Sequence, residues 1–238
     1  MRAVITFHSL DYDASVLSFP PSRFAHFIES LARNRIPVVS YAELRGRERG
    51  VTLTFDDGMR SLHEAALPVL REHRIPAHLF LTTGAVGRDN GWRSQPAQAP
   101  RYAMLDWKQV AACAAGGVLV ESHTRSHADL RRLGNDAIAA ECAAADAEIE
   151  QRVGRRPRLF AYPYGHFDDR VVAAVAGLYE ACFTTRMAYF DGGADPARAP
   201  RLDAYYLQSR WVQERLLSWP VRSYLDGRSL IRALRGIR

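Results

Sequence analysis

The sequence predicts an α/β fold with a largely parallel sheet in a single domain. Strand-like and helix-like segments alternate along the whole chain, which is the pattern of repeated βα units. The chain has 238 residues, a length at which α/β barrels occur as one domain. It contains no internal repeat and no low-complexity linker. Its composition, 47% hydrophobic and 24% charged, is that of a globular protein with a sizeable core.

Seven short runs of apolar and β-branched residues have the character of buried strands. Each run is bounded by polar residues, glycine or proline, as strands of α/β folds are. The predicted strands are residues 3–7, 36–40, 51–55, 77–81, 118–120, 159–162 and 181–185. The segments 84–101 and 187–201 contain glycine and proline and are predicted to be long loops. Loops of that length inside a compact domain tend to be functional.

Five segments between the strands repeat apolar residues at helical spacing. The predicted helices are residues 20–34, 61–73, 106–117, 135–154 and 169–176. Ser61 and Glu64 have the spacing of a capping box, and Pro68 predicts a kink in the same helix. Asn135 is expected to cap the fourth helix, and Gly154 is expected to end it.

Several classes of protein are disfavoured by simple features of the chain. The N-terminal residues lack the long apolar region and the cleavage site of a signal peptide. No stretch approaches the ~18 apolar residues of a membrane-spanning helix. The three cysteines, Cys113, Cys142 and Cys182, are odd in number and far apart, so buried thiols are expected rather than a disulfide framework. A cytoplasmic location is therefore the expectation.

Polar side chains recur immediately after the predicted strands. Because the carboxyl ends of parallel strands converge on one rim, these side chains are expected to meet where α/β barrels place their active sites. The residues concerned are His8, Asp56, Asp57, His123, His127, Tyr164 and Gly165.

The histidines of "SHTRSH" are candidates for metal ligands. His123 and His127 are four residues apart, which places both rings on one side of a helical turn. One carboxylate on the same rim would complete a three-ligand site with open positions for water and substrate. In "TFDDG", a divalent cation would compensate one of the adjacent carboxylates, Asp56 and Asp57, and leave the other free as a base. The alternative is that Asp56, Asp57 and Gly58 simply form a turn.

Three motifs resemble a known family in their order and spacing. "TFDDG", "SHTRSH" and "RRPRLFAYPYG" are similar to the first three motifs of the polysaccharide deacetylase family, also called the NodB homology domain or carbohydrate esterase family four. The resemblance covers about residues 4 to 203. It implies a distorted (β/α) barrel that removes acetyl groups from N-acetylated sugars. It also implies a bound divalent metal, most often Zn²⁺, with Co²⁺, Ni²⁺ or Mn²⁺ as alternatives.

The resemblance also implies roles for individual residues. Asp56 matches the family's general base, and Asp57, His123 and His127 match its metal ligands. The metal would polarise the amide carbonyl and acidify water, and the base would take the proton. Tyr164 matches the family position whose backbone N–H donates to the oxyanion. Its neighbours Pro163 and Gly165 belong to the same substrate-binding motif.

The sequence departs from the common family pattern in two places. Ala161 stands where the third motif usually carries an arginine that pairs with the base, and no histidine follows His166 to supply the usual general acid. "TFHSLDYD" resembles the N-terminal segment of the poly-N-acetylglucosamine deacetylase branch, in which the acid comes from the first strand. His8 is therefore the candidate acid. Arg201, in "PRLDA", is the candidate support for the base.

Other aromatic residues and histidines are weaker candidates. Trp92 lies in a predicted long loop and is the better of the possible sugar contacts. His166 could line the cleft. Two alternative functions stay open: an amidohydrolase acting on a non-sugar amide or imide, and a non-catalytic saccharide-binding barrel. The intact set of acidic residues and histidines argues against the second, because a binding module needs no free base beside a metal.

The deacetylase-like barrel is expected over residues 1–208, followed by a basic amphipathic segment over 209–238. Seven arginines against two acidic residues in this segment account for most of the net charge of +6. A basic patch confined to one end argues against a nucleic-acid partner. The segment could contact the inner membrane face peripherally, or pack on the barrel as a solvated helix. The expected partner is an N-acetylated glycan substrate.

Overall fold

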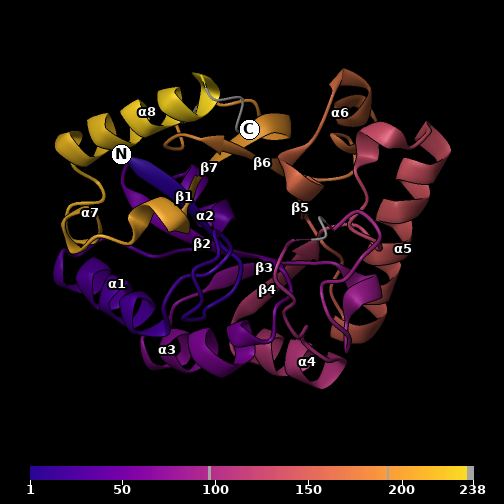
Figure 1. The fold of residues 1–238 in the computed structure, drawn as a ribbon, viewed down its shortest axis with the longest axis horizontal. Helices are drawn as coiled ribbons and strands as arrows, with labels where there is room; N and C mark the ends of the chain where they lie inside the picture. The colour runs from indigo at the N-terminus through magenta and orange to yellow at the C-terminus, as the bar shows by residue number, and fades with distance from the viewer. Residues whose placement is uncertain (96–97, 192, 235–238) are drawn as a thin grey trace.

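The computed structural model describes residues 1–95, 98–191 and 193–234 of the chain. Within these residues, seven strands form a closed barrel in chain order, and every neighbouring pair is parallel (Figure 1). The strands are β1 (Arg2–Phe7), β2 (Gly50–Asp57), β3 (Ala77–Leu81), β4 (Val118–Ser122), β5 (Leu159–Ala161), β6 (Ala181–Met187) and β7 (Ala199–Asp203). The predicted barrel is therefore confirmed.

Helices surround the barrel in a ring (Figure 1). They are α1 (Pro21–Arg33), α2 (Tyr41–Arg45), α3 (Leu67–Glu72), α4 (Trp107–Ala115), α5 (Asn135–Val153), α6 (Asp169–Val175), α7 (Arg210–Glu214) and α8 (Trp219–Leu234). The five predicted helices correspond to α1, α3, α4, α5 and α6. None of the described helices is both long enough and apolar enough to cross a membrane.

The predicted strand 36–40 is wrong. This segment makes only an isolated bridge from Val38 to Val51. The segment competes with β3 for one edge of β2. Because β3 pairs with that edge from Thr54 onward, only the first residues of β2 can pair with the segment. The predicted loop 187–201 is also wrong in part, because β6 extends to Met187 and β7 begins at Ala199.

Two predicted helix caps are wrong as well. Ser61 has helical backbone angles, and its hydroxyl accepts from the Leu10 N–H at 2.9 Å instead of capping a helix. A π-helical turn, Leu62–Ala66, precedes α3, so the backbone is irregular just before Pro68, where the kink was expected. Gly134, not Asn135, occupies the cap position of α5. Gly154 ends α5 in the left-handed conformation, as predicted.

The core joins the barrel to both ends of the chain. Phe7 of β1 stacks on Phe55 of β2 at 5.3 Å, and Phe24 of α1 packs edge-on against both. Val212, Leu216, Val221 and Leu225, from α7 and α8, belong to the same buried cluster. The segment beyond residue 208 therefore packs on the barrel as far as Leu225. Residues 235–238 of the predicted amphipathic tail lie outside the described residues.

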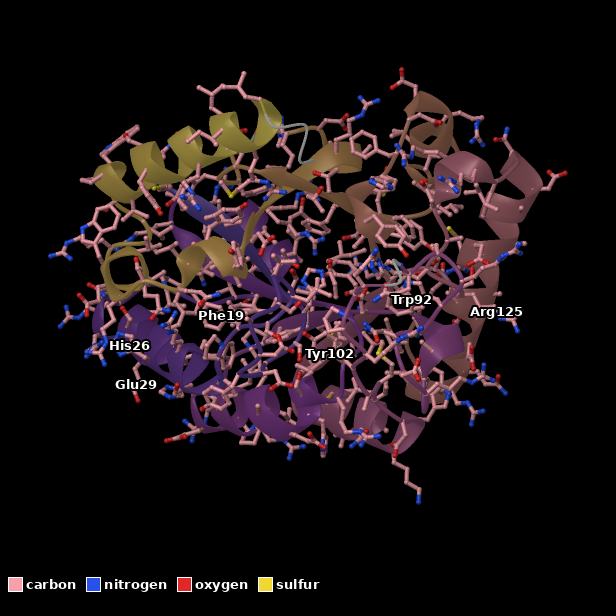
Figure 2. The ribbon with its side chains drawn as sticks, in the orientation of Figure 1. Phe19, His26, Glu29, Trp92, Tyr102 and Arg125 are labelled. Carbon is pink, nitrogen blue, oxygen red and sulfur yellow. The ribbon has the colours of Figure 1, made fainter. Side chains whose placement is uncertain are left out.

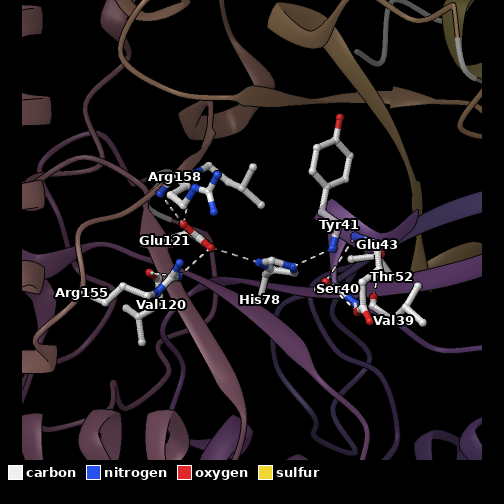
Figure 3. A network of polar contacts seen from close by, with 11 residues as sticks. Val39, Ser40, Tyr41, Glu43, Thr52, His78, Val120, Glu121, Arg155 and Arg158 are labelled. Atoms are coloured by element: carbon white, nitrogen blue, oxygen red, sulfur yellow. Dashed lines mark hydrogen bonds and ion pairs between the residues drawn. The ribbon is translucent and has the colours of Figure 1, made fainter. Parts of the chain in front are cut away.

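A buried polar network ties three strands together (Figure 3). Glu121 of β4 accepts from His78 of β3 at 3.1 Å, from Arg155 at 2.8 Å, and from the backbone N–H groups of Arg158 and Leu159 at 2.8 and 3.0 Å. Burial alone would raise the pKa of the Glu121 carboxyl, but the hydrogen bond from His78 and the charge of Arg155 hold it below its ordinary value. The carboxylate thus joins the end of β4, just before His123, to the start of β5.

Candidate active site

The carboxyl ends of the strands bring together the predicted metal ligands. Asp57 ends β2, and its register partner on β3 is Leu81, which in turn pairs with Ser122 of β4. His123 follows Ser122 directly, so it stands level with Asp57. One ligand atom from each of Asp57, His123 and His127 lies within 4.8 Å of the others, and all three residues are buried.

The donor set of this cluster fits a divalent metal. Nε2 of His123 and Nε2 of His127 lie 3.2 and 3.3 Å from the same oxygen, Oδ1 of Asp57. Nδ1 of His123 lies 2.8 Å from the carbonyl oxygen of Ala161, which can only accept, so Nδ1 carries the proton. In the neutral ring, Nε2 then presents a lone pair toward the carboxylate. An anion, this lone pair and the Nε2 atom of a second imidazole gathered at one point fit a cation site.

Electrostatics favour the protonation states that a metal site requires. Burial raises the pKa of Asp57, but His127 and His123 outweigh it and hold the carboxyl well below its ordinary range. Burial lowers the pKa of His127, so this ring is neutral near pH 7 despite the neighbouring carboxylate. An ionised carboxylate with a neutral imidazole is the state in which both bind metal.

The backbone is strained at three residues of the site. Asp57, His127 and Tyr164 have φ angles of 72°, 55° and 60°. Side chains other than glycine rarely adopt this left-handed region, and each instance costs about 1–3 kcal/mol. Such strain clusters at functional sites, because the surrounding structure must hold the side chain in a required direction.

Asp56 is paired with an arginine from β7, two strands away around the barrel. Nη1 and Nη2 of Arg201, on β7, donate to the two carboxylate oxygens of Asp56, each at 2.7 Å. Both side chains are buried, and the guanidinium also lies over the rings of Phe80 and Phe183, at 5.6 and 5.8 Å from their centroids. Burial raises the pKa of Asp56, but the charge and hydrogen bonds of Arg201 outweigh it, so the carboxyl is ionised at neutral pH.

Ala161 leaves a position that Arg201 fills from elsewhere. An arginine at position 161, as in the common family motif, would reach Asp56 from β5, whereas Arg201 reaches it from β7. The structure thus brings Arg201 to Asp56, in the arrangement that the sequence led us to expect. The residue that pairs with Asp56 is thus an arginine, as in the common motif, but it comes from a different strand.

His8 lies on the same rim as the two carboxylates. Phe7 pairs with Phe55, so His8 comes beside Asp56 at the end of the neighbouring strand. The charge of His8 is among the causes that lower the pKa of both Asp56 and Asp57. Among the described residues, no hydrogen bond to the His8 ring is present, which leaves both ring nitrogens available.

The turn Pro163–Gly165 presents a free backbone donor. Gly165 also has a left-handed φ of 66°, and a Cβ at this position would lie 2.2 Å from Oγ1 of Thr185, so only glycine fits. The N–H groups of Gly165 and His166 are bonded within the turn. The backbone hydrogen bonds of the described residues include none from the Tyr164 N–H.

The loop after β3 covers one metal ligand. The Trp92 ring stacks on the His127 ring with centroids 4.2 Å apart, and Nε1 of Trp92 donates to the Tyr164 hydroxyl at 2.8 Å. Trp92 accordingly lies inside the ring of helices, whereas His26, Glu29 and Arg125 lie at its outside (Figure 2). The predicted sugar contact is thus half-buried and oriented by its neighbours.

Ser94 is a site residue that the sequence did not reveal. Its hydroxyl donates to the His127 carbonyl at 2.9 Å and accepts from the Tyr164 hydroxyl at 2.9 Å. No motif marks it, because the contacts join residues 33 and 70 positions apart through loops. His166 lies on the other side of Tyr164, with ring centroids 5.6 Å apart.

Comparisons with known proteins agree with this fold and site. Poly-beta-1,6-N-acetyl-D-glucosamine N-deacetylase of Staphylococcus epidermidis is 27% identical over 65% of the chain, and chitin deacetylase of Amylomyces rouxii is 30% identical over 53%. The chain spans 54% and 26% of the length of these two relatives.

One solved structure shows the same barrel over most of both chains. IcaB from Ammonifex degensii has a TM-score of 0.73 at 23% identity, and the match covers 89% of this chain and 97% of that chain. The family model described as polysaccharide deacetylase matches residues 44–180, which include Asp56, Asp57, His123, His127 and Tyr164. This chain belongs to the polysaccharide deacetylase family.

Proposed function

We propose that the chain is a metal-dependent hydrolase that removes N-acetyl groups from an N-acetylated glycan. The observation that carries the proposal is the buried cluster of Asp57, His123 and His127 beside an ionised Asp56 that is held by Arg201. A barrel that only binds saccharides has no use for an ionised carboxylate that is free to accept a proton next to a cation site. The named activities of the two relatives support an N-acetylated hexosamine glycan as the substrate.

The chain's own residues divide the reaction between them. A divalent ion on Asp57, His123 and His127 would polarise the acetamide carbonyl and promote ionisation of water. Asp56 accepts the proton of that water, because Arg201 keeps the carboxylate ionised and oriented. The free Tyr164 N–H donates to the oxygen on which negative charge develops. The fixed backbone at Tyr164 means that this donor needs no reorganisation during the reaction.

His8 is the proposed general acid. Expulsion of the sugar amine requires a proton on the nitrogen, and no histidine follows His166 in the chain. His8 lies beside Asp56 and has no hydrogen-bond partner among the described residues. A protonated imidazole at this position can donate its proton to the leaving nitrogen.

Metal content per chain is the first test of the proposed function. Protein purified without added metal or chelator should contain about one divalent ion, most often zinc, and His123→Ala should lose most of it, because a three-ligand site loses a ligand. His73→Ala, which replaces a histidine at the end of α3, should retain the metal. Acetate release from N-acetylglucosamine oligomers should follow metal content across the three proteins. A wild-type chain that stays metal-free after reconstitution would contradict the proposal.

We also propose that the end of α8 contacts an anionic membrane surface. Leu230, Ile231 and Leu234 are exposed, with exposed fractions of 62%, 47% and 79%, on a helix rich in arginine. Apolar residues flanked by basic ones suit peripheral binding at the inner membrane face. Replacing all three with Ser should reduce flotation with anionic liposomes without changing the melting temperature, because these side chains bury little. Equal flotation of the variant and the wild type would contradict membrane contact.

A further inference from the structure

A cavity lined by three arginines opens next to the proposed active site. Its volume is about 340 Å³, which is within the range of small-molecule sites. Arg131 comes from the loop after β4, Arg186 from the end of β6, and Arg232 from α8. Three guanidinium groups far apart in the sequence therefore share one cavity. Among the described residues that line it, none is acidic.

Two of these arginines have no carboxylate partner within the described residues. Arg131 is paired with Asp129, from Nη2 to Oδ2 at 2.7 Å, and also lies 2.9 Å from Nδ1 of His166. No ion pair of the described chain includes Arg186 or Arg232. Arg232 is instead positioned by the Tyr206 ring, 5.3 Å from its centroid, and by Sδ of Met187 at 3.9 Å. A guanidinium fixed by neutral neighbours remains available to an external anion.

The neighbouring cavity provides an internal contrast. It has about 400 Å³ and is lined by Arg186 and Arg198, but also by Asp191 and Asp195. Positive and negative groups are balanced there. The cavity at α8 has an unbalanced positive charge, and like charges that share a cavity repel unless an anion compensates them.

The cavity adjoins the turn that carries Tyr164. Gly165 lines it, and the preceding residue is Tyr164. The Tyr164 ring lies between the rings of His127, at 4.4 Å, and His166, at 5.6 Å. A ligand group in the cavity would thus lie beside the turn whose Tyr164 ring contacts His127, one of the three clustered residues.

We propose that this cavity binds a phosphate or carboxylate group of the substrate, so that the enzyme acts on an anionic N-acetylated sugar. The inference rests on the proposed function. Planar guanidinium groups bind both anions in a bidentate manner, so the three arginines suit either one. α8 therefore contributes directly to substrate choice, through the one arginine that it extends into the cavity.

Rates with soluble substrates of different charge test the proposal. The metal-loaded full chain is assayed for acetate release from a neutral N-acetylglucosamine oligomer, from N-acetylglucosamine 1-phosphate, and from a disaccharide of N-acetylglucosamine and a uronic acid. At least one anionic substrate should have a kcat/KM about tenfold above the neutral one. A preference for the phosphate or for the uronic acid identifies the anion. Equal values for all three would overturn the proposal.

Variants distinguish binding of the anion from a general structural effect. Arg186→Gln and Arg232→Gln should each lower kcat/KM for the anionic substrate about tenfold, mostly through KM, and leave the neutral substrate unchanged. Arg228→Gln is the matched control: Arg228 lies on the same helix and contacts the same Tyr206 ring at 5.3 Å, but does not line the cavity. Equal losses with both substrates, or the same loss in the control, would overturn the proposal.

Binding without turnover separates this proposal from the proposed function. Calorimetry with N-acetylglucosamine 1-phosphate on the Asp56→Asn chain should show binding that Arg232→Gln weakens about tenfold. If no N-acetylated sugar is hydrolysed but this binding persists, the deacetylase function fails and the anion site stands. If neutral sugars are hydrolysed and this binding is absent, the anion site alone fails.

Discussion

Asp56→Asn should reduce acetate release by about a hundredfold to ten-thousandfold, which is the usual contribution of a general base. The amide has nearly the same shape but cannot accept the proton. Because Asp56 is ionised at neutral pH and is not among the clustered ligands, the variant should keep the metal content of the wild type. Steady-state rates and metal analysis on the same preparation provide the measurement.

Asp136→Asn is the control for this change. Asp136 is an exposed residue in the first turn of α5, and its replacement should leave the rate unchanged. If Asp56→Asn retained more than a tenth of the activity, another group would have to be the base. If it lost the metal together with the activity, Asp56 would belong to the ligand set.

Arg201→Met should destabilise the fold by about 3–5 kcal/mol at pH 7, because it leaves the Asp56 charge buried without a partner. The Asp56 carboxylate and its arginine are both almost fully buried inside the barrel. Urea unfolding of the wild type and the variant measures the difference. The double variant Arg201→Met with Asp56→Asn should recover much of the loss, since no buried charge remains.

The pH dependence of this loss has a definite sign. In the wild type, the pKa of Asp56 lies below its ordinary value, so its contribution to stability is present above that value and is lost as the pH falls through the folded pKa. Without Arg201, burial would raise the pKa of Asp56. Protonation of Asp56 at lower pH would then remove the buried charge that destabilises the variant. The difference in unfolding free energy should therefore be largest at neutral pH and narrow toward pH 4. A constant difference would contradict a charge-based cause.

The convergence of the two aspartates and the two histidines could be predicted, because the strands and the motifs both point to the same residues. Asp56 and Asp57 end a run that is otherwise apolar, and the histidine pair follows another such run. Arg201 was reached through the family resemblance, although its strand was missed: Pro200 and two charged residues give "APRLD" the composition of a loop. Only the buried partner, Asp56, explains why that segment is a strand.

What could not be predicted depends on contacts between distant segments. Segment 36–40 has the composition of a strand, but β3 occupies the edge that it would need. The Trp92–Tyr164 contact joins two loops, and the three arginines of the cavity come from three separate elements. The local sequence pattern contains no information about such contacts, because the closure of the barrel brings the segments together.

The pairing of Asp56 with Arg201 also has a consequence for biosynthesis. The two residues are 145 positions apart, and β7 is the strand that closes the barrel against β1. A nascent chain emerges from the ribosome N-terminal end first, so β1 to β6 are exposed before the closing strand exists. During that interval the chain has an open sheet edge and an Asp56 carboxylate without its arginine. Closure of the barrel must therefore wait until residue 203 has emerged, and Asp56 gains its arginine only at that late stage of synthesis.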